Sequence, residues 1–235
     1  MPEFVTAFAP ASVGNLGCGF DVLGMALEEP GDRVTARRSG SGRVRIVEIR
    51  GDGGALSMEP DRNVVGVAAT ALLRTHGPDA IGIGIELTLE KGLPLSAGMG
   101  GSAASAVAAV VAVNALLELG ASDTQLLQSA LAGEAAAAGA GHPDNAAPSL
   151  LGGIVLCRGS GDALDLVPLP VPAGLTVVLV HPHVLLPTAE GRAVLPAQIP
   201  LPVAVQQWGN VGAMVAALHS ASSDLPWHPH VHALT

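Results

Sequence analysis

The 235-residue sequence contains no tyrosine, three phenylalanines, two tryptophans and a single lysine, Lys91. Aromatic residues make up 2% of the chain, so the tyrosine stacking surface of many RNA-binding proteins is not available. Twenty Asp and Glu against 11 Lys and Arg give a formal net charge of −9, whereas nucleic-acid backbones select basic surfaces. A nucleotide stays compatible with this charge, because salt screens exposed charges beyond ~8 Å. The composition therefore argues against a nucleic-acid partner but not against a small phosphorylated ligand.

Disulfide, export and membrane signals are also missing. Two cysteines, Cys18 and Cys157, form no disulfide framework, which favours a reducing compartment. The first residues lack the basic segment and apolar run of a signal peptide. The most apolar stretch, 103–119, is rich in alanine and carries polar residues, so it is typical of a core helix rather than a membrane span. We expect a cytoplasmic protein with no membrane partner.

The order of elements predicts an α+β fold, because strands and helices are mixed without regular βαβ alternation. Glycines and prolines gather near 155–170, which predicts two domains, residues 1–157 and 158–235. Residues 33–38 and 43–50 alternate polar and apolar side chains and are expected to pair through the turn at 39–42. Further strands are expected at 5–9, 81–89, 154–157 and 175–180, and helices at 63–75, 102–119, 122–138, 188–195 and 203–219.

The most informative segment is the glycine- and serine-rich turn within 93–105, LPLSAGMGGSAAS, which joins a strand to a helix. Glycines at 98, 100 and 101 leave the backbone accessible, so successive N–H groups can point at one anion. The helix that follows adds roughly +0.5 of a charge at its start, and phosphate commonly occupies such sites. It is not the common P-loop, since Lys91 precedes the loop instead of following its last glycine. A tight turn chosen for packing is the alternative interpretation.

Two more clusters accompany this loop: PASVGNLGCGFD at 10–21 and GHPDNAAP at 141–148. Together the three segments resemble the GHMP small-molecule kinases, and among them the homoserine kinases, in order over residues 5–218. The resemblance implies a ribosomal protein S5 domain 2-like N-terminal domain followed by an incomplete ferredoxin-like C-terminal domain. It also implies ATP-dependent phosphorylation of the side-chain hydroxyl of L-homoserine to O-phospho-L-homoserine, in threonine biosynthesis. A homodimer is compatible with it.

For the nucleotide, the resemblance implies that backbone N–H groups of the loop wrap the phosphates of ATP. The loop residues concerned are Pro94, Leu95, Ser96, Ala97, Gly98, Met99, Gly100, Gly101 and Ser102. It places Asn63 on the adenine side and implies a Mg²⁺ ion held by Ser102 and Glu134. From the residues alone, Asn63 is equally well explained as a helix cap. For Glu134 the residues alone favour an exposed helix carboxylate.

For the substrate, the resemblance places Asn15 near the hydroxyl of homoserine and Asp21 near its ammonium group. Arg192 matches an arginine that binds the substrate carboxylate, for which a guanidinium fork is well suited. Thr188 would support the phosphates, so the catalytic set is Asn15, Thr188 and Arg192. Other residues of the pocket are His142, Asp144 and Asn145. Asp21 is alternatively an ordinary turn residue, and His142 an extended residue before Pro143. The expected reaction is direct in-line transfer with no general base.

The sequence departs from the family in one respect. The third glycine-rich motif of GHMP kinases, of the form G-x-G-P-T, and the second carboxylate-binding arginine before it do not occur in these 235 residues. We therefore expect weak or no kinase activity from this chain alone, with partly uncovered apolar faces at 175–180 and 203–218. Two alternatives stay open: a remnant that retains nucleotide binding, and a GHMP kinase acting on a different small alcohol.

Overall fold

The computed structural model describes residues 2–77, 80, 82–180 and 188–220. Its centre is a sheet of six strands in the described residues, ordered β3-β4-β2-β5-β6, with β1 paired to β2. The strands are β1 (Phe4–Gly14), β2 (Leu23–Ser39), β3 (Val44–Arg50), β4 (Gly84–Glu90), β5 (Ile154–Arg158) and β6 (Asp165–Leu169). Strand β2 is long enough to bind β1 along most of its length and to pair with both β4 and β5 on its other side. It therefore connects the two halves of the sheet.

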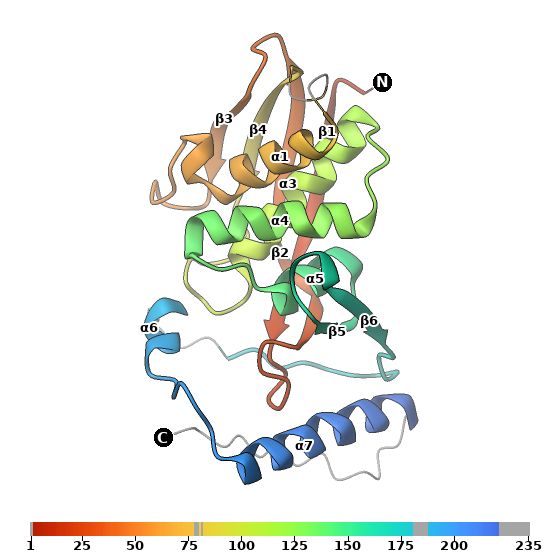
Figure 1. The fold of residues 1–235 in the computed structure, drawn as a ribbon. Coiled ribbons are helices and arrows are strands. Elements are labelled where there is room, and N and C mark those ends of the chain that lie inside the picture. Colours follow the sequence, from red (N-terminus) through yellow and green to blue (C-terminus); the bar gives the residue numbers. More distant parts are fainter. Residues whose placement is uncertain (1, 78–79, 81, 181–187, 221–235) are drawn as a thin grey trace.

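The helices lie mainly on one face of this sheet, where α1, α3 and α4 cross it (Figure 1). The helices are α1 (Val64–Thr75), α3 (Gly101–Leu117), α4 (Asp123–Ala138), α5 (Pro143–Leu151), α6 (Thr188–Ala193) and α7 (Leu201–Ser220), with short 3₁₀ turns η1 (Pro60–Arg62) and η2 (Gly161–Ala163). Each α-helix expected from the sequence is present within a few residues of its predicted bounds. The start of α4 shows why, because Ser122 and Gln125 form a reciprocal capping box that defines its first turn.

Alternation along the strands separates a buried face from a solvated one. On the helix side, Val34, Leu87 and Leu89 are fully buried against the helices. On the other side, Arg33 and Arg37 of β2 lie over the rings of Phe8 and Phe4 of β1, at 4.9 and 5.5 Å from the ring centroids. These exposed phenylalanines are thus partly covered by arginine side chains rather than by a helix. The sheet can therefore face water on this side.

The expected hairpin between residues 33–38 and 43–50 is wrong. The two segments are strands, but β4 lies between them, antiparallel to β2 and parallel to β3. The reason is burial: β4 is the more apolar strand, and the central position hydrogen-bonds both of its edges. Alternation of side chains reports the faces of a strand but not the identity of its neighbour.

The expected strand at 175–180 is also wrong, because this segment has no regular structure and its apolar side chains are exposed. A strand needs a hydrogen-bonded neighbour, and none of the described strands lies beside it. Strand β6 was missed, since Pro168 interrupts its pattern. Proline is tolerated there because β6 pairs only with β5 among the described strands and lies at the sheet edge.

Helix α7 lies below the end of the sheet (Figure 1). Its Met214 is buried in a second apolar cluster with Leu23, Ile154 and Leu169, while Trp208 is 65% exposed. The apolar side chains at 175–180 are exposed, and those at 203–218 are only partly covered, as expected. The predicted division after residue 157 falls inside β5, and it stays a prediction.

No helix within the described residues is long and apolar enough to cross a membrane.

Candidate active site

The three glycine-rich segments, far apart in sequence, meet where β1 ends and α3 and α5 begin. The backbone N–H of Ser12 donates to the carbonyl of Met99 at 3.1 Å. The hydroxyl of the same serine donates to Asn145 Oδ1 at 3.0 Å. One residue of the first segment therefore contacts both the loop and the third segment. This arrangement builds a single site from residues 10–21, 94–102 and 141–148.

Glycines allow this close approach. At Gly100, whose φ is 65°, an added Cβ atom would lie 2.1 Å from the hydroxyl oxygen of Ser12. At Gly14, a Cβ atom would lie 2.6 Å from a carboxylate oxygen of Asp144. Distances this short are not tolerated between non-bonded atoms, so a side chain at either position displaces the Ser12 hydroxyl or the Asp144 carboxylate from its place in the site. The glycines are a requirement of the site and not only of the turns.

The start of α3 is an uncapped helix N-terminus. The N-cap residue is Gly100, which offers no side-chain acceptor, and the first turn carries no acidic residue. The first hydrogen bond at the helix start runs from the N–H of Ala104 to the carbonyl of Gly100 at 2.9 Å. The N–H groups of 101–103 therefore lack intrahelical acceptors. Free N–H groups and the positive end of a 17-residue helix together favour an anion.

Two oxygen-bearing side chains, one on α3 and one on α4, have chemistry suited to a hard cation. The Oγ atom of Ser102 is buried and has no hydrogen-bond partner in the described part of the chain. Glu134 of α4 is 3% exposed, so its interpretation as an exposed helix carboxylate is wrong. It accepts a hydrogen bond from the N–H of His142 at 3.2 Å. Burial, with a smaller contribution from the charge of Asp144, raises the pKa of Glu134 to about 7. A hydroxyl without a partner and a buried carboxylate fit the oxygen chemistry of Mg²⁺.

A cavity of about 200 Å³ adjoins this region. Its lining comes from the first segment, the third segment with the residue before it, and α6: Asp21, Ala140, Gly141, His142, Pro143, Asp144 and Arg192. The Nε2 atom of His142 is buried without a partner among the described residues. Burial and the neighbouring charge of Asp21 raise the pKa of Asp144 above its ordinary value. The cavity thus combines acidic, basic and unpaired polar groups in a small volume, as expected of a site for a small polar molecule.

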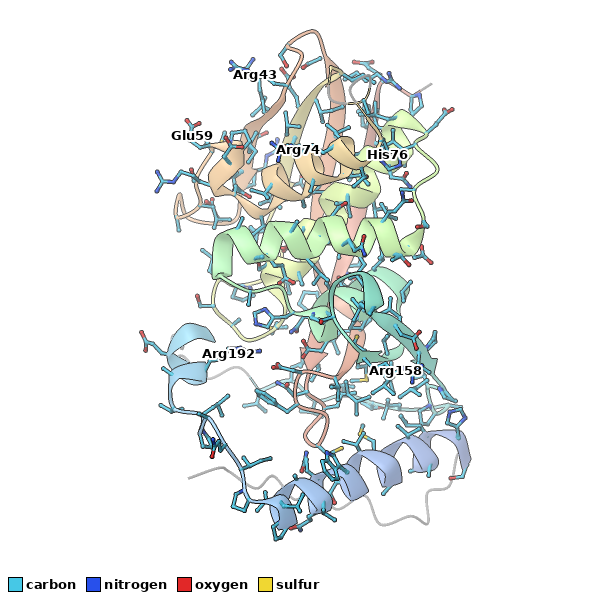
Figure 2. All side chains as sticks on the ribbon, in the orientation of Figure 1. Arg43, Glu59, Arg74, His76, Arg158 and Arg192 are labelled. Atoms are coloured by element: carbon cyan, nitrogen blue, oxygen red, sulfur yellow. The ribbon has the colours of Figure 1, made fainter. Side chains whose placement is uncertain are left out.

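Arg192 and Asp21 pair with each other across this cavity. The guanidinium donates from Nη1 to Oδ2 at 3.0 Å and from Nη2 to Oδ1 at 2.6 Å. Figure 2 shows the Arg192 side chain extending from α6 toward the loop between β1 and β2. Asn15, whose φ is 68°, accepts the N–H of Asp21 on its side-chain oxygen at 2.9 Å. This loop is therefore arranged by local hydrogen bonds and held to α6 by an ion pair.

Two further site residues expected from the sequence are Asn63 and Thr188. Asn63 caps α1: its Oδ1 accepts the N–H of Val65 at 3.1 Å and its Nδ2 donates to the carbonyl of Ser57 at 2.8 Å. The helix-cap interpretation is confirmed, and an adenine contact by Asn63 stays a prediction. Thr188 begins α6, but its side chain lies outside the described part of the structure.

A larger cavity, of about 520 Å³, lies between β3, η1 and α1, where Figure 2 labels Arg43 and Glu59. None of the predicted site residues lines it. Its volume alone therefore does not make it the reactive centre.

Sequence reasoning missed one feature of the loop. Lys91, noted only for its position before the loop, forms a buried ion pair with Asp32 of β2, and Ser105 of α3 bonds to both. The only signal in the sequence was that Lys91 is its single lysine, because Asp32 lies in a strand with several other charged residues.

Comparison with known proteins adds an independent finding. The profile of the GHMP kinases N terminal domain matches residues 63–153. The homoserine kinase of Chloroherpeton thalassium is 48% identical over 222 residues, covering 91% of this chain and 69% of that protein. The homoserine kinase of Chlorobaculum tepidum is 46% identical over 228 residues, covering 94% and 70%.

Solved structures agree. The crystal structure of homoserine kinase from Cytophaga hutchinsonii superposes with a TM-score of 0.87 at 45% identity, covering 96% of this chain and 70% of that one. Mevalonate kinase of L. major, at 17% identity and a TM-score of 0.62, shares the fold, covering 92% and 70%.

Proposed function

This chain belongs to the homoserine kinases of the GHMP kinase family, and we propose that it transfers the γ-phosphoryl group of ATP to the side-chain hydroxyl of L-homoserine. The product is O-phospho-L-homoserine, a step of threonine biosynthesis. The predicted α+β fold and the predicted family are confirmed by these relatives. The observation that carries the proposal is the convergence of three glycine-rich segments around the uncapped start of α3.

The nucleotide phosphates are proposed to bind at that helix start. The N–H groups of 101–103 have no side-chain cap, and the turn at 96–100 contains two glycines, so both can supply backbone donors. Phosphoryl transfer needs mainly alignment and neutralisation of charge, which such donors provide. Asn63, at the start of α1, is retained as the predicted adenine-side residue.

Ser102 and Glu134 are the residues proposed to hold Mg²⁺. The ion supplies positive charge that offsets the charge of the nucleotide phosphates. The proposal rests on the partnerless hydroxyl of Ser102 and on the burial of the Glu134 carboxylate.

Homoserine is proposed to occupy the smaller cavity. Its carboxylate would replace Asp21 as the partner of Arg192, and its ammonium group would replace Arg192 as the partner of Asp21. A zwitterion satisfies both charges at once, whereas a ligand with one charge leaves the other residue unpaired. Asn15 is then next to the hydroxyl, His142, Asp144 and Asn145 line the pocket, and Thr188 supports the phosphates.

No general base is required by this proposal. Alignment of the hydroxyl with the γ-phosphorus contributes as much as ~7–11 kcal/mol in favourable intramolecular cases. We therefore propose direct in-line transfer. A homodimer and a cytoplasmic location stay predictions.

A coupled assay for ADP release tests the proposal, with homoserine, threonine and mevalonate as acceptors. We expect turnover that is weak overall but at least 100-fold faster with homoserine than with the other two. Turnover with mevalonate alone would identify a different GHMP kinase. Nucleotide binding by calorimetry without turnover would identify a binding remnant, and no nucleotide binding to the folded, magnesium-containing protein would overturn the site.

A further inference from the structure

The proposed phosphate loop is attached to the fold at both of its ends by one buried ion pair. Asp32 lies on β2, Lys91 follows the last residue of β4, and the loop runs from there to the start of α3. Their side chains are 0% and 3% exposed. Lys91 is the sole lysine of the sequence, and it points beneath the loop rather than toward solvent.

Asp32 holds the entry to the loop. Its Oδ1 atom accepts the backbone N–H groups of Gly92 at 3.0 Å and Leu93 at 3.1 Å. Its Oδ2 atom accepts Nζ of Lys91 and the hydroxyl of Ser105, the latter at 2.6 Å. A carboxylate with four donors has its acceptor capacity filled, so the chain entering the loop is fixed to β2.

Lys91 holds the exit from the loop. Its Nζ atom donates to the carbonyl of Gly101 and to the hydroxyl of Ser105, each at 3.0 Å. Both acceptors belong to the first turns of α3, the helix whose N–H groups are proposed to bind phosphate. A movement of this ammonium group therefore moves the helix start with it.

Stability alone does not account for the pair. The desolvation cost of a buried ion pair commonly cancels its Coulombic gain, and neutral side chains of similar size are often as stable. The pair is also neutral overall and lies under the loop, so it adds little attraction for an anion. What it provides is geometry, because one rigid unit connects β2, the end of β4 and the first turns of α3.

We propose that Asp32 and Lys91, joined by Ser105, are positioning residues that hold the loop amides in the arrangement required for nucleotide phosphates. This inference rests on the proposed nucleotide site. It assigns the pair no contact with ligand and no share in the phosphoryl transfer itself.

The test is the double substitution Asp32→Asn with Lys91→Met, which removes both charges without leaving either one buried and unpaired. Asparagine keeps an oxygen for the N–H groups of Gly92 and Leu93, so the variant mainly loses the contacts of Lys91 to α3. Thermal unfolding checks the fold, and titrations with a fluorescent Mg·ADP analogue and with homoserine give the two dissociation constants. We expect the nucleotide constant to rise at least tenfold and the homoserine constant to stay within twofold.

The matched control is Arg50→Met with Glu90→Gln, which neutralises a neighbouring ion pair of 3.1 Å that is 59% and 44% exposed. It changes the same number of charges beside the loop and should leave both constants within twofold. A folded Asp32→Asn, Lys91→Met protein with the parental nucleotide constant overturns the inference but not the proposed function.

If the double variant does not fold, Ser105→Ala decides, because it removes the bridging hydroxyl and keeps both charges. A rise of the nucleotide constant by at least threefold supports the inference, and an unchanged constant overturns it. A parent protein that binds no nucleotide overturns both the proposed function and this inference.

Discussion

Arg192 and Asp21, 171 residues apart in sequence, share two hydrogen bonds of 2.6 and 3.0 Å within the small cavity. Asp21 has the charge needed to bind the ammonium group of an amino acid, and Arg192 has the charge needed to bind its carboxylate. In this structure the two side chains neutralise each other instead. Both side chains are 40% exposed, which keeps the pair accessible to a competing zwitterion. In the proposed function, this ion pair would make the cavity selective for ligands that carry both charges.

The first prediction concerns this selection. In the parent protein, a ligand with a carboxylate and no ammonium group would pair with Arg192 and leave the charge of Asp21 unpaired. Asp21→Asn removes that charge, so the same ligand no longer has this cost. We expect the KM for homoserine to rise about tenfold, the loss of a charge-assisted hydrogen bond, while the inhibition constant of 4-hydroxybutanoate stays the same or falls. Steady-state kinetics measure both values. Asp165→Asn, which breaks the exposed pair with Arg158, is the control and should change neither. Equal weakening of both ligands by Asp21→Asn would contradict the prediction.

The second prediction separates stability from binding at Ser102. Its hydroxyl is buried without a partner in the described residues, so Ser102→Ala removes a desolvated polar group. We expect the unfolding free energy to stay constant or rise by about 1 kcal/mol, while the dissociation constant for Mg·ADP rises at least tenfold. Urea unfolding and calorimetry provide the two numbers. A destabilised variant that binds Mg·ADP normally would argue for a structural role instead.

The third prediction concerns the pH dependence of stability through Glu134. Because burial raises its pKa from 4.5 to about 7, the folded protein holds a proton that the unfolded chain has released between these values. The unfolding free energy contributed by this residue therefore falls as the pH rises through that window. Glu134→Gln carries no such charge, so its stability relative to the parent should increase from near zero at pH 4.5 to about 3 kcal/mol at pH 8.

Urea unfolding without magnesium at pH 4.5, 6 and 8 measures this difference. A stability difference that does not change with pH would show that Glu134 titrates normally in the folded protein. Saturating magnesium and nucleotide should reduce the pH dependence of the parent, since a cation favours the ionised carboxylate.

The fourth prediction compares two loop glycines with nearly the same backbone conformation. The φ angles of Gly98 and Gly100 are 68° and 65°, but a Cβ atom at 98 meets nothing within 4 Å, whereas one at 100 meets Ser12 and Asn145. Gly98→Ala should cost about 1 kcal/mol of unfolding free energy from backbone strain alone. Gly100→Ala should cost at least twice as much and weaken nucleotide binding more than tenfold. Equal effects of the two substitutions would mean that contact between the segments is unimportant.

The helices could be predicted from the sequence because their determinants are local. Ser122 begins α4 through a capping box, Gly139 follows its last residue, and apolar periodicity marks the length between them. Asn63 shows the limit of that reasoning. Its capping role could be read from the sequence, but an additional contact to a nucleotide depends on which groups lie opposite it in space.

Strand neighbours could not be predicted in the same way. The alternation in 43–50 showed a strand correctly, yet β4, about 40 residues later in sequence, occupies the position beside β2. The apolar run at 175–180 has strand composition and no strand partner among the described residues. Pairing between strands depends on residues far apart in sequence, so the local composition of a segment does not predict which strand lies beside it.

By itself, the sequence determined which chemical groups are available to the site. These are glycines that leave the backbone accessible, a helix start without a capping side chain, and the carboxylates, amide and arginine that the proposed ligands require. The tertiary structure alone decided that Arg192 meets Asp21, that Glu134 is buried, and that Asp32 and Lys91 hold the two ends of the loop. The physical reason is distance along the chain. Caps and turns form between residues a few positions apart, whereas burial and ion pairing arise only after the sheet and helices have packed.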